Sequence, residues 1–231
     1  MNGYMSNIKN PAIITGILFL IAISAGIASG FLIPESKLMH DNEGLSTHKP
    51  SIILGVLAGF VMAAACAGIA VSLFPILKNY SESLALASVG FRLTEGILYC
   101  MSVIMVLALS SLNHEQIAVN GVNGSMNVIA RDILLTVRRW SLLAGMLAFT
   151  SGALIYYALF FVHDIIPRWL SGWGLVGAAL AMVSNLFVLR GYYRSSPAVI
   201  FMNIPIGLNE LVLAIWLIAN GFNRNAVMVV E

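Results

Sequence analysis

Charged residues are scarce in this chain, and their scarcity excludes most classes of soluble protein. Only 10% of the 231 residues are Asp, Glu, Lys or Arg, whereas a soluble domain has about 25%. The formal net charge of +2 comes from scattered basic residues, so we expect no nucleic-acid partner. The sequence also lacks a glycine-rich phosphate loop, a zinc-type cysteine pair and a nucleophile elbow.

Cysteine and histidine are also rare, with two and four residues. Cys66 and Cys100 fall at different predicted depths of two neighbouring apolar stretches, so we expect no disulfide. No histidine lies inside an apolar stretch, which argues against a haem held between two membrane helices. We therefore predict neither a metal nor a bound redox or nucleotide cofactor. The remaining candidate metal ligands match no known metal signature: His40, Asp41, Glu43, His48, His114 and Glu115.

What the chain has instead is six long apolar stretches. Each reaches the ~20 residues that a helix needs to cross about 30 Å of hydrocarbon. Because unsatisfied backbone groups are costly in lipid, helices are the expected structure. We predict an all-α polytopic membrane protein, a six-transmembrane-helix bundle that forms a single integral membrane domain over residues 1–231. The predicted spans are about 11–33, 51–74, 84–109, 140–162, 170–189 and 200–222.

The segment at about 127–139, which precedes the fourth span, has a helical pattern with a polar stripe. Arg131 and Arg138 recur at seven residues, as do Asp132 and Arg139. This pattern predicts an interfacial amphipathic segment, after which the chain turns into the membrane. A basic patch for lipid headgroups and a solvated extension of the helix are both consistent with it.

Small residues recur along the second and fifth spans at helical spacing. Such stripes allow two helices to approach closely in lipid, where packing must hold them together. They predict either helix packing within one protomer or a dimer interface. The residues are Gly55, Gly59, Ala63 and Ala67 in the second span, and Gly174, Gly177, Ala178 and Ala181 in the fifth.

Three charged residues, Arg92, Glu95 and Glu210, lie well inside predicted spans. A rise of about 1.5 Å per residue places them at similar depths in the third and sixth spans. A lone central charge costs roughly 2.5–3.5 kcal/mol on insertion scales, and pairing would offset that cost. We therefore predict an ionic cluster between these spans. Candidate polar neighbours are Thr94, Asn185, Asn203 and Asn209.

The two glutamates also mark similar sequence in the two halves of the chain. Leu93-Thr94-Glu95 in the third span parallels Leu208-Asn209-Glu210 in the sixth, about half the chain length further on. Three spans per half is an odd number, so such halves would have opposite orientations in the membrane. The sequence thus allows a 3+3 inverted repeat.

Short blocks of sequence along the chain carry a family resemblance. One is Phe91-Arg92-Leu93-Thr94-Glu95-Gly96, and others lie at 74–78, 82–86, 166–171, 173–175, 210–218 and 221–222. Together they resemble the bacterial membrane protein family catalogued as domain of unknown function 4386. The resemblance implies a six-span protein of the bacterial cell membrane. It implies no activity, because the family is named for lacking one.

The ionic cluster leaves three functional hypotheses open. The leading one is a non-enzymatic transport, sensing or regulatory component of the lipid bilayer, in which the cluster binds a small molecule, an ion or a lipid. The second is an intramembrane lipid-modifying enzyme with Glu95 or Glu210 as general base. The third is a purely structural membrane subunit whose ion pairs fix the helix register. The sequence indicates no protein partner.

Overall fold

The computed structural model describes residues 2–33, 38, 49–118 and 124–223. Their secondary structure is helical, without a strand, and all six helices are long and apolar enough to span a membrane. The predicted all-α, six-helix class is therefore confirmed. His40, Asp41, Glu43 and His48 lie outside the described residues. The helices are α1 (Asn2–Leu32), α4 (Lys49–Leu77), α5 (Glu82–Ala118), α6 (Gly124–Val162), α7 (Arg168–Leu189) and α8 (Pro197–Ala219).

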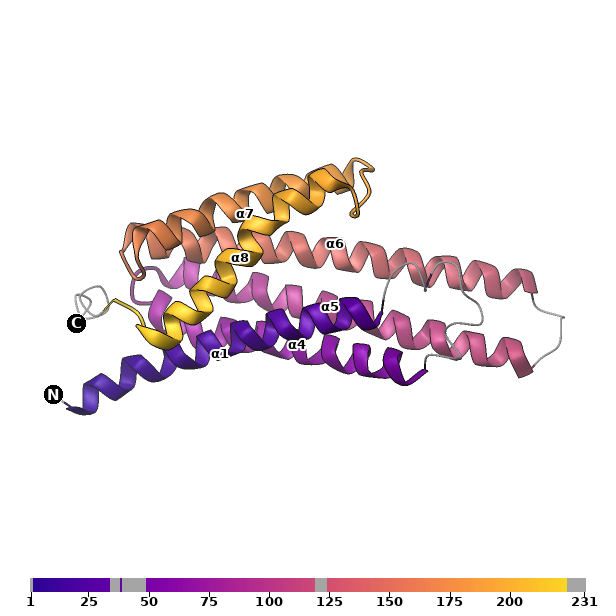
Figure 1. Cartoon of the computed structure of the whole chain (residues 1–231), viewed down its shortest axis with the longest axis horizontal. Coiled ribbons are helices and arrows are strands. Elements are labelled where there is room, and N and C mark those ends of the chain that lie inside the picture. Colours follow the sequence, from indigo (N-terminus) through magenta and orange to yellow (C-terminus); the bar gives the residue numbers. More distant parts are fainter. Residues whose placement is uncertain (1, 34–37, 39–48, 119–123, 224–231) are drawn as a thin grey trace.

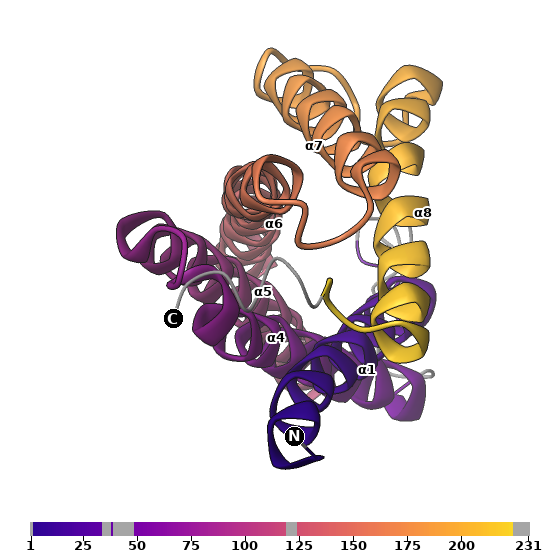
Figure 2. The same ribbon diagram turned by 90° about the vertical axis from the view of Figure 1, so that its left-hand side faces the viewer.

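The helices pack in chain order around a closed ring. Each helix packs against the next one along the chain, and α8 returns to pack against α1. Figure 2 shows this ring nearly end-on, with α8 beside α1. The interior is filled by large side chains, including Phe19 of α1 and Tyr156, Tyr157 and Phe160 of α6, all fully buried. The ring therefore brings side chains from distant parts of the sequence to one central site.

The outer surface of the ring suits a lipid environment. Large apolar side chains such as Phe31, Val71, Ile97 and Phe201 are strongly exposed. In water such a surface would favour aggregation, but in a bilayer it faces hydrocarbon. The six helices that are long and apolar enough to span a membrane overlap the six predicted stretches, and the fourth covers Val128–Val162.

The interfacial segment expected at about 127–139 is not a separate element. It is the N-terminal part of α6, which continues into the membrane span without a turn. In Figure 1, α5 and α6 extend together beyond the other helices. Arg138 Nη1 donates to the carbonyl of Ser102 on α5 at 3.1 Å, and Arg131 Nη2 donates to that of Leu38 at 2.6 Å. These two hydrogen bonds give basic residues of this part of α6 partners on neighbouring segments.

The small residues predicted for packing lie at helix contacts within the chain. A Cβ atom at Gly55 would come within 2.9 Å of Leu32 Cβ on α1, and one at Gly59 would overlap Val103 on α5. Gly174 packs against the ring of Tyr157, and Gly177 against the backbone of α8 at Ile206. Ala63, Ala178 and Ala181 are buried, and Ala67 is half-buried. The stripes therefore support packing within one protomer. The inverted repeat stays a prediction.

The turns on one face of the bundle contact each other. Tyr80, between α4 and α5, stacks on His163, between α6 and α7, with ring centroids 4.3 Å apart. Burial raises the pKa of the Tyr80 phenol above its ordinary value, because the phenolate loses hydration. Residues 190–196, which join α7 to α8, lie at the other end of these helices. The two ends of the bundle thus present different side chains to the two membrane faces.

Candidate functional site

The three charges predicted to lie in the membrane meet inside the ring. Arg92 and Glu95 are one turn apart on α5, and Arg92 Nη1 donates to Glu95 Oε2 at 2.9 Å. Arg92 Nη2 donates to Glu210 Oε1 of α8, also at 2.9 Å. Arg92 and Glu95 are buried. One guanidinium therefore joins the third helix of the chain to the last.

Two further side chains complete this group, and the sequence-based prediction missed both. Tyr156 of α6 accepts a hydrogen bond from Arg92 Nη2 at 3.1 Å, and its hydroxyl donates to Glu210 Oε1 at 3.3 Å. Cys66 Sγ of α4 lies 3.6 Å from Glu95 Oε1, to which it donates. We call Arg92, Glu95, Glu210, Tyr156 and Cys66 the charge cluster. A tyrosine in mid-span needs a partner for its hydroxyl, and that signal would have identified Tyr156.

Aromatic rings enclose the guanidinium of Arg92. Its Cζ lies 4.8 Å from the ring centroid of Phe149, 5.4 Å from that of Tyr156 and 5.5 Å from that of Phe19. A cation over an aromatic face gains up to about 2 kcal/mol when it is desolvated. The planar guanidinium can stack on these rings and still donate along its edge, which a lysine ammonium cannot do. The site is therefore built around an arginine.

The charges in the cluster do not balance. One arginine faces two glutamates, so the ionised cluster has a net charge of −1. An ion inside a protein loses several kcal/mol of hydration, which only close partners restore. The two carboxylates differ in access, because the Glu210 side chain is 13% exposed and that of Glu95 is 4% exposed. A proton or a small cation would neutralise the excess.

Thr94 was predicted as a neighbour of this cluster, but the structure places it elsewhere. The residue is exposed on the outer side of α5, and its hydroxyl donates to the carbonyl of Gly90 at 2.8 Å. One residue along a helix is a rotation of about 100°. Thr94 therefore faces away from the carboxylate of Glu95.

Replacing Thr94 with valine should leave the protein unchanged. The hydroxyl donates only to its own helix, so its loss leaves no buried group unpaired. We expect a change in the free energy of unfolding within about 0.5 kcal/mol. Thermal unfolding of Thr94→Val in detergent checks this. A large destabilisation would mean that the hydroxyl has a role in packing that its exposed position does not suggest.

Asn209 also faces away from the cluster, although it precedes Glu210. It is fully buried, and its Nδ2 donates to the carbonyl of Leu170 at the start of α7 at 2.9 Å. Asn209 thus holds α8 to α7, whereas Glu210 holds α8 to α5.

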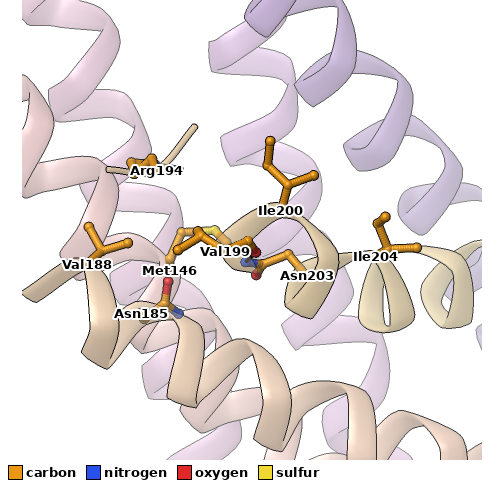
Figure 3. A pocket seen from close by; sticks show the side chains of 8 residues that line it. All are labelled: Met146, Asn185, Val188, Arg194, Val199, Ile200, Asn203 and Ile204. Carbon is orange, nitrogen blue, oxygen red and sulfur yellow. Dashed lines mark hydrogen bonds between the residues drawn. The ribbon is translucent and has the colours of Figure 1, made fainter. Parts of the chain in front are cut away.

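The remaining two predicted residues, Asn185 and Asn203, line a separate pocket of about 370 Å³. Figure 3 shows it between the end of α7, the loop residue Arg194 and the start of α8. Asn203 Nδ2 donates to Ser184 Oγ and to the carbonyl of Val199, both at 2.7 Å. The polar residues predicted from sequence therefore divide between two places, the charge cluster and this pocket.

Comparison with known proteins identifies the family. The family model described as "Domain of unknown function (DUF4386)" matches residues 14–221, which include all the residues of the charge cluster and the pocket. Neither the curated proteins nor the solved structures gave a match. Because the matched region covers most of the chain and contains its membrane helices, this multi-pass membrane protein belongs to the DUF4386 family.

Proposed function

We propose that this protein is a non-enzymatic component of the bacterial cell membrane that transports, senses or regulates in response to a proton held by the charge cluster. The observation that carries the proposal is the sharing of one guanidinium by two carboxylates on different helices. Such a site has a stable neutral form only when it holds one extra proton or cation. Ionisable groups inside a membrane are costly, and they often mark ion and proton pathways.

Glu210 is the carboxylate through which the cluster is open to its surroundings. Its side chain is the more exposed of the two, at 13%. Both hydrogen bonds that it accepts from Arg92 and Tyr156 end on the same oxygen, Oε1. Glu95, in contrast, accepts from Arg92 on Oε2 and from Cys66 on Oε1. The titratable and charged groups around Glu210 are Arg92 and Glu95 of α5, Tyr156 and Tyr157 of α6, and Cys66 of α4.

A proton held by the charge cluster would loosen α8. A hydrogen bond to a charged group is roughly twice as strong as one between neutral groups. With the proton bound, the attraction of the two carboxylates to Arg92 would weaken, while Asn209 would continue to hold the other side of α8 to α7. The proton would therefore weaken the contact of α8 with α5 and α6 but keep its contact with α7. A movement of this kind is suited to a sensor or a transporter.

A structural role for the cluster is the second candidate. The short ion pairs and the enclosure of Arg92 by aromatic rings are also what a permanent link between helices requires. In that case the cluster would exchange no proton. The remaining hypothesis from the sequence, a lipid-modifying enzyme, has less support, because neither Glu95 nor Glu210 lines the pocket.

Replacing Glu210 with glutamine should abolish proton exchange but keep the protein folded. The amide oxygen can still accept from Arg92 and Tyr156, and the Arg92–Glu95 pair that remains is neutral. Infrared difference spectra of the protein in lipid, recorded across a pH titration, should show in the wild type a carboxylic-acid band of the cluster that is missing from Glu210→Gln. Glu95→Gln should also lose the band, because a single carboxylate balances Arg92. Hydrogen exchange of α8 should rise with protonation in the wild type only.

The matched control is Glu82→Gln, which changes the same residue type at an exposed position of α5. It should keep the band and the exchange behaviour of the wild type. If the wild type shows no carboxylic-acid band of the cluster, or if both Glu210→Gln and Glu95→Gln keep it, the cluster is structural. The proposed function is then wrong.

A further inference from the structure

The pocket between α7 and α8 contains buried hydrogen-bond donors without partners. Arg194 Nη1 and Asn185 Nδ2 are both enclosed and make no hydrogen bond, and Asn185 is only 4% exposed. Both residues line the pocket, as Figure 3 shows. A buried donor without an acceptor costs free energy, so each one in a folded protein calls for an explanation. A hydrogen-bond acceptor bound in the pocket would give both donors a partner.

The charges around the pocket select an anion. Arg194 contributes a positive charge, and none of the residues that line the pocket is acidic. The start of α8 lies at the same place. Its N-cap residue Ser196 makes no side-chain capping bond, and the Ser196 hydroxyl is itself buried without a partner. A helix N-terminus carries partial positive charge and uncapped N–H groups, which favour phosphate.

The other side of the pocket is apolar and continues onto the lipid-facing surface. Ile200 and Ile204 line it one turn apart on α8, and both are exposed on the outside of the bundle. Val188 of α7 and Met146 of α6 also contribute apolar wall. A free inorganic anion gains nothing from contact with these apolar side chains, whereas an acyl chain can pack along them. The volume of about 370 Å³ suits a headgroup, because small-molecule sites begin at about 300 Å³.

We infer that this pocket binds the phosphate headgroup of an anionic phospholipid. The phosphate accepts hydrogen bonds from Arg194 Nη1 and Asn185 Nδ2, beside the start of α8. The glycerol part lies toward Asn203, whose Oδ1 has no partner and accepts a hydroxyl of the headgroup. The acyl chains leave the pocket along Ile200 and Ile204 into the bilayer. This site is separate from the charge cluster and does not depend on the proposed proton exchange.

Lipid titration of the purified, delipidated protein tests the inference, with native mass spectrometry to measure binding. Phosphatidylglycerol should bind more tightly than phosphatidylcholine, diacylglycerol or inorganic phosphate. Arg194→Gln should weaken phosphatidylglycerol binding by about tenfold, as expected for the loss of a charged hydrogen bond. The affinity of Arg194→Lys for phosphatidylglycerol should lie between those of the wild type and Arg194→Gln, because lysine keeps the charge without the planar guanidinium.

The control is Arg190→Gln, which removes the same charge from an exposed arginine of the same connection outside the pocket. It should bind phosphatidylglycerol as the wild type does, and size-exclusion profiles should show that all the variants are folded. Equal losses in Arg190→Gln and Arg194→Gln would mean that the lipid responds to overall charge, and the pocket would not be its site. Equal affinity for phosphatidylcholine, diacylglycerol or inorganic phosphate would also overturn the inference.

Discussion

Replacing Arg92 with methionine should destabilise the protein more than any other single change in the charge cluster. Methionine fills a similar volume, but Glu95 and Glu210 then lie together in the core without a cation. Removing one partner of a buried ion pair typically costs about 3–5 kcal/mol. Thermal unfolding in detergent should show a melting temperature lower by at least about 6 °C, with a smaller folded fraction on size exclusion.

Two further variants identify the cause of this loss. In the triple variant Arg92→Met, Glu95→Gln, Glu210→Gln, no charge is left unpaired, and we expect most of the stability to return, as it does when buried ion pairs are replaced together. Glu210→Gln alone should lose far less stability than Arg92→Met, because Arg92 and Glu95 still balance and the amide oxygen can still accept from Arg92. If the triple variant is as unstable as Arg92→Met, packing of the guanidinium against its aromatic rings, and not charge, dominates at this site.

Replacing Gly16 with leucine should separate α1 from α8. A Cβ atom at Gly16 would lie 2.7 Å from the carbonyl oxygen of Ala214 and 2.7 Å from Ile218 Cγ1. The backbone oxygen cannot move without shifting α8, and Glu210 lies one turn before Ala214 on that helix. Overpacking a well-packed contact costs about 1–3 kcal/mol, and more where backbone must move. We expect a loss at the upper end of this range or beyond, measured by thermal unfolding.

Gly30→Leu is the matched control on the same helix. Gly30 is exposed, and a Cβ atom there would meet nothing within 4 Å. Because leucine favours helix by nearly 1 kcal/mol over glycine, this variant should be as stable as the wild type or slightly more stable. An equal loss in both variants would show that α1 tolerates no larger residue anywhere, and the contact with Ala214 would not be the cause.

The helices and the meeting of the charges could be predicted from sequence because membrane constraints are simple. Backbone groups in lipid must bond within the helix, so apolar length alone identifies the spans. Charged residues are so rare there that Arg92, Glu95 and Glu210 had few partners except each other. Their depths follow from the rise per residue. The continuity of α6 could not be decided from sequence, because the polar stripe of Arg131 and Arg138 fits both an interfacial segment and an extension of the membrane helix.

The neighbours of the charges were harder to predict, because they depend on helix rotation and on uncharged groups. Thr94 and Asn209 adjoin the glutamates in sequence, but about 100° per residue turns them toward other surroundings. Cys66 resembles an apolar residue in composition, and its contact with Glu95 appears only when α4 and α5 are docked. The pocket at Asn185 and Asn203 depends on the arrangement of α7, α8 and the loop between them, which no local pattern encodes.

The unequal sharing of charge between α5 and α8 has a consequence for biosynthesis. The third helix enters the bilayer with Arg92 and Glu95 one turn apart, so its charges cancel within a single segment. The last helix carries Glu210, whose cation belongs to a segment inserted earlier. We therefore expect the insertion of Glu210 to be easier once Arg92 is already in place. Closure of the ring by α8 would then complete the assembly, and a ribosome-bound chain truncated before it would contain the Arg92–Glu95 pair alone, already balanced.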